Sequence, residues 1–172
     1  MMRTALLIAA LLTLAACGFQ PVHGRAYRAQ QDLDLSSVRI ETNTSRLGQL
    51  LKAEIERGAN PDYERAEKLY TLQVQVAESE IYLFVNPDGT AGRGDIEYRS
   101  TYQLVRNLDR KAVAQGNIIR TASYNISETA DYATYVSEED ARKRGIIELA
   151  QDYKLRMANL LAQLNAKTGS GV

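Results

Sequence analysis

The 172-residue sequence contains few of the residues that build most metal and catalytic sites: one cysteine, one histidine and no tryptophan. A single cysteine excludes an internal disulfide and any site with several thiolate ligands. The one histidine, His23, leaves almost no histidine-based zinc or catalytic arrangement open. Lysine and arginine number 21, as do aspartate and glutamate, and a zero net charge argues against a protein that coats DNA or RNA. We therefore expect a protein that is not an enzyme, with no catalytic residue, metal site or nucleic-acid partner.

The N-terminal segment has the pattern of a secretory signal peptide. Arg3 gives a short positive start, and residues 4–14 form an uncharged, mostly apolar run that is too short for a stable transmembrane span. Small residues then precede Cys17, as in the bacterial lipobox, where the cysteine thiol is acylated and becomes the first residue of the mature chain. Because the only cysteine lies at the required position, we expect Cys17 to carry covalent diacylglycerol and an N-acyl lipid, with no other cofactor.

The lipid on Cys17 predicts where the protein resides. One acyl chain, at roughly 0.8 kcal/mol per CH₂, anchors a protein only marginally, whereas two or three chains hold it permanently. Gly18 rather than aspartate follows Cys17, as in lipoproteins sorted to the outer membrane. We therefore expect a lipid-anchored protein on the periplasmic face of the outer membrane. Its expected parts are a signal peptide (1–16), a lipidated tether (17–35), one α/β domain (36–166) and a polar tail (167–172).

Apolar periodicity predicts a strand and a helix after the tether. Residues 37–42 alternate apolar and polar side chains, which is typical of a short strand. A helix follows, which Asn43, Thr44 or Ser45 would cap and Gly58 would end. The apolar stripe of this helix consists of Leu47, Leu50, Leu51 and Ile55.

Three further strands are expected, with a strong turn signal at residues 86–89. The first covers residues 69–85, and its apolar set moves from even to odd positions after Ala77, which predicts a bulge or a strand that leaves its sheet. The next two cover residues 93–106 and 113–126. Their expected inward-facing side chains are Ile96, Tyr98, Tyr102, Leu104, Ile118, Ala122, Tyr124 and Ile126.

The last helix has the clearest pattern. Residues 137–140 resemble a capping box and predict a helix that starts at Ser137. Its apolar stripe is Ile146, Ala150, Tyr153, Met157, Leu160 and Leu164. A helix between the first two strands implies a parallel crossover, and the other strands form an antiparallel meander. The predicted fold is therefore an α/β two-layer sandwich: a mixed four-stranded sheet with two helices, in the order β-α-β-β-β-α.

Few side chains suggest chemistry. Glu78 and Glu80 would lie about 7 Å apart on one strand face, a spacing that a glycosidase uses, but an ordinary polar strand face is the favoured interpretation. The apolar run 81–85 ends at a hairpin tip. Either this tip projects and docks on a partner, or Ile81 and Leu83 complete the core, which is favoured for these two residues.

Basic side chains supply candidate anion contacts. Arg93 follows the hairpin tip, and Arg142, Lys143 and Arg144 form a cluster near the start of the last helix. A guanidinium can grip phosphate bidentately, so an anionic ligand is one interpretation of these residues. Simple solvation of a charged surface is the other.

The start of the mature chain resembles a known family. Residues 17–24, Cys-Gly-Phe-Gln-Pro-Val-His-Gly, are similar to the opening of the lipopolysaccharide (LPS)-assembly lipoprotein family, LptE. Residues 122–127, 132–133 and 139–144 resemble versions of that family from alphaproteobacteria. The resemblance spans the mature chain and agrees with the predicted element order. It implies a plug-like lipoprotein held inside the large outer-membrane barrel LptD, where it assists barrel assembly and LPS delivery to the outer leaflet.

The resemblance also implies partners and a site. The expected partners are LptD, LPS and the inner leaflet of the outer membrane. Basic residues bind LPS in some members, and the candidates here, from charge and position alone, are Arg93, Arg142, Lys143 and Arg144. The hairpin residues expected to contact the barrel are Phe84, Pro87 and Gly89. The alternative is an auxiliary lipoprotein of an ABC-type lipid-trafficking system, and the sequence disfavours a small lipoprotein hydrolase because it lacks a nucleophile–base pair.

Overall fold

The computed structural model describes residues 35–59, 67–84, 92–127 and 130–169. The chain divides into two compact units, residues 1–31 and 32–172, and the described residues all belong to the second. Within them, no helix is both long enough and apolar enough to cross a membrane.

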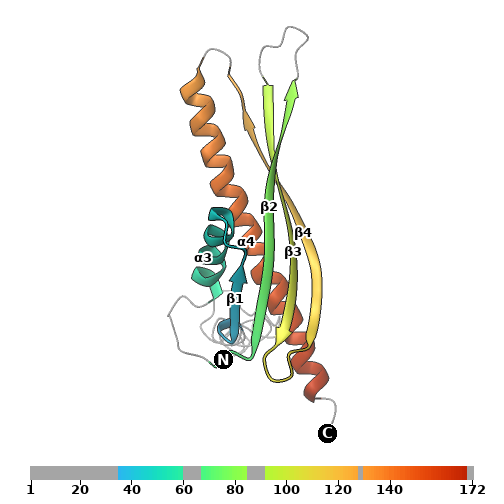
Figure 1. The fold of residues 1–172 in the computed structure, drawn as a ribbon. Coiled ribbons are helices and arrows are strands. Elements are labelled where there is room, and N and C mark those ends of the chain that lie inside the picture. The colour runs from blue at the N-terminus through green and yellow to red at the C-terminus, as the bar shows by residue number, and fades with distance from the viewer. Residues whose placement is uncertain (1–34, 60–66, 85–91, 128–129, 170–172) are drawn as a thin grey trace, which may run out of the picture. The chain divides into compact units, whose positions relative to one another are not determined.

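One mixed four-stranded sheet forms the first layer of this unit (Figure 1). Its strands are β1 (Val38–Thr42), β2 (Tyr70–Phe84), β3 (Gly92–Arg106) and β4 (Ala112–Asn125). They lie side by side in the order of their numbers. β1 runs parallel to β2, whereas β2, β3 and β4 form an antiparallel meander, as the sequence predicted.

Two helices form the second layer on one face of the sheet. α3 (Arg46–Ala59) packs on β1 and β2, and α4 (Asp131–Gly169) packs on β3, β4 and α3 (Figure 1). The backbone N–H of Gly48 donates to Ser45 Oγ over 3.0 Å, so Ser45 is the cap of α3. The element order β-α-β-β-β-α and the mixed sheet confirm the predicted α/β sandwich.

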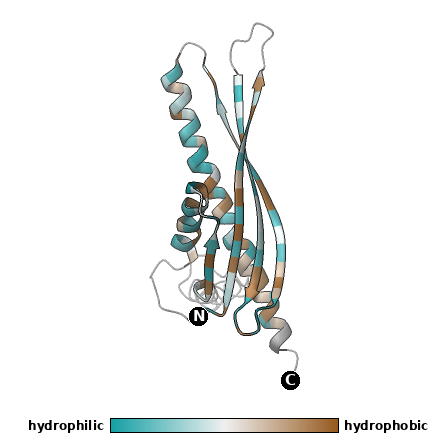
Figure 2. Ribbon diagram, in the orientation of Figure 1, coloured by the Kyte–Doolittle hydropathy of each residue, from teal (hydrophilic) through white to brown (hydrophobic). Residues whose placement is uncertain are grey.

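Alternate side chains of each strand form the core, because successive side chains point to opposite faces of a sheet. Figure 2 shows the resulting alternation of hydrophobic and hydrophilic residues along the strands. The even-numbered residues of β2, β3 and β4 face the helices, and those buried include Leu72, Val74, Val76, Ile96, Tyr98, Tyr102, Leu104, Ile118, Ala122 and Tyr124. All strand residues predicted to face inward are buried, except Ile126, which is half-buried.

Hydrogen bonds inside the core connect α4 to the sheet. The Tyr153 hydroxyl donates to Ser100 Oγ (2.9 Å), and the Ser100 hydroxyl donates to the carbonyl oxygen of Ile118 (3.2 Å). Burial raises the pKa of Tyr153 to about 12. Its ring meets that of Tyr102 edge to face, with centroids 5.8 Å apart. Among the described residues, no buried side-chain nitrogen or oxygen lacks a hydrogen-bond partner.

α4 begins at Asp131, so the prediction of a start at Ser137 is wrong. The N–H of Thr134 already donates to the carbonyl four residues earlier, over 3.1 Å. Asp140, the residue that would reach back to a cap at Ser137, pairs instead with Arg144 one turn later. The added turns, residues 131–136, bury no side chain, so no buried apolar stripe marks them in the sequence.

β2 contains no bulge, and the prediction drawn from its change of apolar phase after Ala77 is wrong. Every residue of β2 pairs with β3 as far as Phe84, which lies opposite Gly92. The phase changes because the apolar side chains move to the face of the sheet that the helices leave uncovered. Ile81 and Leu83 lie there, 47% and 44% exposed, so the expectation that they complete the core is also wrong.

The side chain of Asn43 extends the β1–β2 ladder beyond the end of β1. Its Nδ2 donates to the carbonyl of Val76 (3.0 Å), and its Oδ1 accepts the N–H of Val76 (3.4 Å). In the part of the chain that the structure describes, no strand pairs with that edge of β2 farther along. Residues 78–84 therefore pair with β3 alone.

Candidate functional site

The predicted site residues that the structure describes lie toward the end of the sheet where β2 stops and β3 starts. Phe84 is the last residue of β2, and Arg93 is the second residue of β3. One turn of α4 passes the same region and carries the predicted cluster Arg142, Lys143 and Arg144. Three predicted site residues lie outside the described part of the chain: Cys17, Pro87 and Gly89.

Arg142 binds three carboxylates from two elements. Its guanidinium, 24% exposed, pairs with Glu78 and Glu80 of β2 and with Glu138 in α4 (Nη2 to Oε1, 2.8 Å). Burial lowers the pKa of Arg142, but the hydrogen bond to Glu138 and the charges of Glu78 and Glu80 outweigh it, so the pKa lies above its usual value. Arg142 therefore stays charged at physiological pH and links α4 to β2 by ion pairs.

Glu78 and Glu80 form an ion-pair network instead of an acid–base pair, because both bind the same guanidinium. Glu80 also accepts a hydrogen bond from the hydroxyl of Tyr82 (2.7 Å). This bond and the charge of Glu80 raise the pKa of Tyr82 to about 12. In the described parts of the chain, no three histidine, cysteine, aspartate or glutamate side chains are grouped to hold a metal ion.

Arg93 and Arg144 meet at a single residue of β4. Arg93 Nη2 donates to Ser123 Oγ (2.6 Å), and Arg144 Nη2 donates to the carbonyl of Ser123 (3.4 Å). Each is about half exposed, and each has one carboxylate partner, Asp95 for Arg93 and Asp140 for Arg144. The structure thus brings together two basic side chains that lie far apart in the sequence.

Lys143 lies on the opposite side of α4, toward α3. With Arg142 it lines a groove of about 540 Å³ between α3, α4 and β2. Apolar side chains of the groove are Leu47, Leu50, Ile146 and Ile147. The sequence cluster 142–144 is therefore divided: Arg142 and Lys143 face this groove, and Arg144 joins Arg93 at β4.

Apolar and aromatic side chains are exposed around the hairpin end. Tyr82 is 54% exposed between Ile81 and Leu83 in β2. The first turns of α4 lie at the same end (Figure 1) and expose Tyr132 and Tyr135, 81% and 60% respectively. Sequence reasoning found the first group but missed the second, because the helix was expected to begin after Tyr135. Only the apolar character of residues 132–136 signals them in the sequence.

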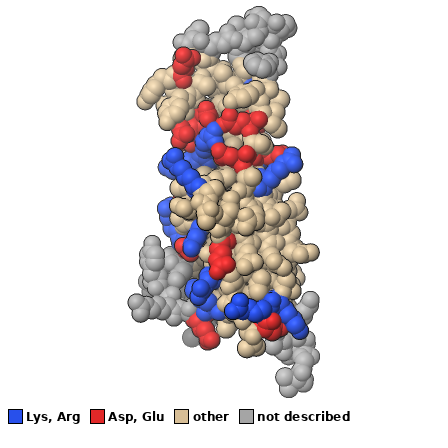
Figure 3. All heavy atoms as spheres, in the orientation of Figure 1, with Lys and Arg blue, Asp and Glu red and all other residues tan. Residues whose placement is uncertain are grey.

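The face of the sheet that the helices leave uncovered is mainly polar. In Figure 3, charged side chains gather in a band toward the hairpin end and again at the opposite end, with a mostly uncharged area between them. Amides and hydroxyls on this face are those of Gln73, Gln75, Thr101, Gln103, Gln115, Asn117 and Thr121. These side chains are exposed. A face of this kind suits contact with water or with another polar surface.

No protein-family model matches the sequence, and no curated protein matches it. The structure is nevertheless similar to solved bacterial lipoproteins. A candidate lipoprotein from Caulobacter crescentus superposes with a TM-score of 0.63 at 22% identity, over 78% of this chain and 96% of that one. This chain shares the fold of that protein.

Two further solved structures agree with this result. Rare lipoprotein B from Shewanella oneidensis gives a TM-score of 0.55 at 13% identity, over 74% of this chain and 98% of that one. A minor lipoprotein from Acinetobacter baumannii gives 0.50 at 16% identity, over 71% and 91%. Because nearly the whole of each lipoprotein is matched, the similarity covers their complete folds and not a shared substructure.

Proposed function

We propose that the protein is a lipid-anchored, non-enzymatic lipoprotein of the outer membrane that fits as a plug into the LPS-assembly barrel LptD. In this role it assists assembly of the barrel and insertion of LPS into the outer leaflet. Cys17 with its acyl chains would hold the domain at the inner leaflet. The resemblance of residues 17–24 to the LptE family and the fold shared with solved lipoproteins support the proposal.

The main support for this proposal is the polar face of the sheet that the helices leave uncovered. The interior wall of a large outer-membrane barrel is polar and wet, because its apolar side chains point toward lipid. A protein that fits inside such a barrel needs an outer surface of hydrogen-bonding groups. The amides and hydroxyls of β2, β3 and β4, such as Gln75, Thr101 and Asn117, supply this surface without the charge that would be costly to desolvate.

The hairpin end would make the firmest contact with the barrel. Ile81 and Leu83 on the sheet and Tyr132 and Tyr135 on α4 are exposed at this end. Their burial contributes about 25 cal/mol for each Å² of apolar surface removed from water. Aromatic side chains such as these are also enriched at the centres of protein interfaces.

LPS would meet the basic side chains near this end. Arg93 and Arg144, which meet at Ser123, have half-exposed side chains. One guanidinium group can bind two oxygens of a phosphate through two parallel hydrogen bonds. Lys143 adds a point charge at the groove beside α3. Arg142 already binds three carboxylates, so a phosphate would have to compete with them.

Co-purification tests the proposal directly. The tagged lipoprotein is co-expressed with LptD of the same organism and purified in detergent through the tag. The expected result is a stable one-to-one complex on gel filtration. Absence of a complex from a barrel shown to be folded contradicts the proposal, and recovery of an ABC transporter instead favours the auxiliary-lipoprotein alternative.

Two variants that introduce glutamate test whether the hairpin end contacts the barrel. We expect the double variant Ile81→Glu, Leu83→Glu to reduce recovery of the complex at least tenfold, because two carboxylates would be buried against the barrel. The control is Leu108→Glu in the β3–β4 turn, where the side chain is 92% exposed. All three substituted side chains are exposed, so thermal unfolding should change little. Equal recovery of both variants would exclude the hairpin end as the contact.

A triple substitution tests whether the exposed basic side chains bind LPS. Replacing Arg93, Lys143 and Arg144 with glutamate should weaken LPS binding without unfolding the domain, because the side chains of Arg93, Lys143 and Arg144 are exposed. Arg142 is left unchanged, since its loss would disturb the link between α4 and β2. Unchanged LPS binding by this triple variant would remove these residues from the proposal and leave the plug role intact.

A further inference from the structure

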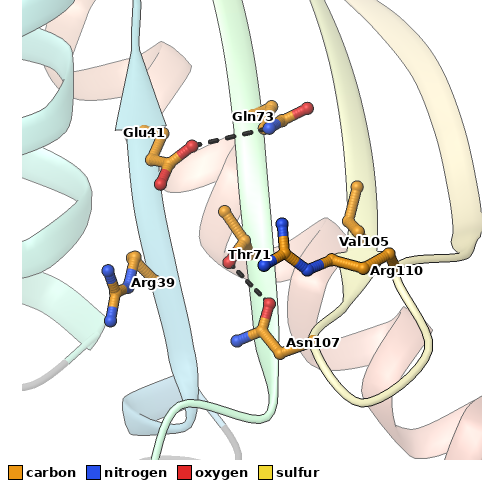
Figure 4. Close-up of a pocket in the computed structure, with 7 residues that line it drawn as sticks. All are labelled: Arg39, Glu41, Thr71, Gln73, Val105, Asn107 and Arg110. Atoms are coloured by element: carbon orange, nitrogen blue, oxygen red, sulfur yellow. Dashed lines mark hydrogen bonds between the residues drawn. The ribbon is translucent and has the colours of Figure 1, made fainter.

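A polar pocket lies on the uncovered face of the sheet, at the end away from the hairpin. Its volume is about 310 Å³, and its lining residues come from β1, β2, β3 and the β3–β4 turn (Figure 4). The residues drawn there are Arg39, Glu41, Thr71, Gln73, Val105, Asn107 and Arg110. Neither the sequence patterns nor the contact proposed for the hairpin end accounts for it.

Two arginines of this pocket have no acidic partner. Most arginines in the described parts of the chain pair with a carboxylate, as Arg106 does with Asp109. Within the same parts, the side chains of Arg39 and Arg110 form no ion pair or hydrogen bond. The side chain of Arg110 extends from the turn across the sheet toward Thr71, and Arg39 stands on β1 at the other side of the pocket (Figure 4). The pocket therefore holds unused N–H donors.

Arg110 has a strained backbone. Its φ is 59°, and it is the one non-glycine residue with positive φ in the described part of the chain. It occupies a tight turn in which the N–H of Arg106 donates to the carbonyl of Lys111 (2.9 Å). Glycine or asparagine adopts this conformation at lower cost. Backbone strain is often found where a side chain must be placed for binding, and here it places the Arg110 guanidinium over the pocket.

The floor of the pocket is fixed and rich in acceptors. Asn107 is held by its Nδ2, which donates to the carbonyl of Lys68 (2.6 Å), and by its Oδ1, which accepts the hydroxyl of Thr71 (2.8 Å). Because the only proton of that hydroxyl is used, Thr71 Oγ1 presents lone pairs to the pocket. Glu41 adds carboxylate oxygens, weakly held by Gln73 Nε2 at 3.5 Å. Two cations and one anion give the pocket a net charge of about +1.

We propose that this pocket binds an anionic sugar. Arg110 would grip the phosphate or carboxylate group of the ligand, and Arg39 would turn inward to complete the clamp. Neighbouring hydroxyls of the sugar would donate to Glu41 and Thr71, whose oxygens need donors that a bare anion lacks. The site goes beyond the plug role, because a specific ligand pocket is no part of that role and no residue of the hairpin end lines it. A free sugar phosphate, a free sugar acid and the head of a glycolipid share this chemistry.

Titration of the ¹⁵N-labelled full chain in detergent micelles tests the ligand class. The probes are glucose 6-phosphate, glucuronate, neutral glucose and inorganic phosphate. We expect the two anionic sugars to shift amide signals of residues 71–73 and 107–111, inorganic phosphate to bind at least threefold more weakly, and glucose to give no shifts. Equal shifts with glucose, or inorganic phosphate bound as tightly as the sugars, would overturn the proposal.

A second titration, with a glycolipid, distinguishes a membrane ligand from a free sugar. Monophosphorylated lipid A in mixed micelles should shift the same signals and be displaced by glucose 6-phosphate if a membrane glycolipid is the ligand. Shifts with the soluble sugars alone assign the pocket to a free anionic sugar. If no anionic probe shifts the signals of these residues, the pocket is not a binding site.

Arg110→Gly separates binding from folding. The substitution removes the guanidinium and relieves the positive φ, so affinity for glucose 6-phosphate should fall at least tenfold while the thermal midpoint stays equal or rises. The matched control is Arg106→Gln, which removes the same charge from the same turn and should keep affinity within twofold. Arg39→Gln should lower affinity severalfold. Unchanged affinity in Arg110→Gly, or an equal loss in Arg106→Gln, would show that the pocket does not bind the ligand.

Discussion

The ring of Tyr98, in β3, occupies the space beside Gly145, in α4, that a side chain at residue 145 would fill. Tyr98 is fully buried, and its hydroxyl donates to the carbonyl of Arg142 over 3.2 Å. Because glycine lets the ring lie against the helix backbone, α4 approaches the sheet closely at this point. The same contact sets the position from which Arg142 reaches β2.

A small side chain at residue 145 should therefore destabilise the protein. We expect Gly145→Val to lower the free energy of unfolding by about 1–3 kcal/mol, because its Cβ collides with the Tyr98 ring. Gly58→Ala in α3 is the matched control, since the added carbon meets only the flexible end of Lys154. The control should be neutral or stabilising by up to about 1 kcal/mol, the helix preference of alanine over glycine. Urea unfolding of both variants decides the matter, and equal losses would contradict the close approach.

Arg142 should matter for stability far more than its neighbour Arg144. Arg142→Met leaves Glu78, Glu80 and Glu138 close together without a cation, and we expect a loss of about 1–3 kcal/mol. Arg144→Met removes an exposed pair and should cost less than about 0.5 kcal/mol. Chemical denaturation measures both.

A second substitution distinguishes charge repulsion from lost packing. In the Arg142→Met background, Glu138→Gln removes one of the three unbalanced charges and should recover part of the stability. In the wild-type background the same change removes a partner of Arg142 and should destabilise. If Glu138→Gln has the same effect in both backgrounds, Arg142 acts through its aliphatic stem and not through its charge.

Asn43 should be sensitive to any change of its amide. Asn43→Ala leaves the N–H and carbonyl of Val76 without this partner, and we expect a loss of about 1–3 kcal/mol. Thr44→Ala, next to it and exposed, should change stability by less than about 0.5 kcal/mol. Amide hydrogen exchange adds a local readout: the Val76 amide should exchange faster in Asn43→Ala only. Equal exchange rates in both variants would exclude the proposed pairing.

Stability should fall at high pH through buried tyrosines. Burial raises the pKa of Tyr98 and of Tyr153 to about 12, against about 10 for an unfolded tyrosine. Between these values the folded protein keeps protons that the unfolded chain has lost, so stability is fully present below pH 10 and decreases as the pH rises toward 12. Each tyrosine can add a slope of up to about 1.4 kcal/mol per pH unit. Urea unfolding at several pH values measures how steeply the free energy of unfolding falls with pH. This fall should be less steep for Tyr153→Phe, and an unchanged fall would show that Tyr153 does not contribute to it.

The fold could be predicted because its core follows simple periodicities. The alternation in β3 and β4 and the stripe of α4 from Ile146 to Met157 matched the buried residues. The start of α4 could not be predicted, since the turns from Asp131 onward rest on few buried contacts and carry no apolar period. The apolar period of a sequence indicates which face of a helix is buried. It gives little information about turns that extend beyond the elements on which the helix packs.

The site was harder to predict because sequence distance hides spatial grouping. Arg142, Lys143 and Arg144 are adjacent in the chain, yet a helix turns each residue by about 100° from the last, and they separate onto two sides of α4. Arg93 and Arg144 meet at Ser123 although they are 51 positions apart in the sequence. The carboxylates that bind Arg142 come from β2, and only the packing of α4 on the sheet determines that they meet.

The edge of β2 along residues 78–84, with which no strand in the described part of the chain pairs, has a consequence for how molecules of this protein behave toward one another. An unpaired strand edge is a template on which a second chain can add a strand and begin aggregation. Along residues 78–84 this edge carries Glu78 and Glu80, held by Arg142. A strand from another molecule could add there only by burying these charges. The network that links α4 to β2 therefore also keeps the molecules from assembling strand by strand.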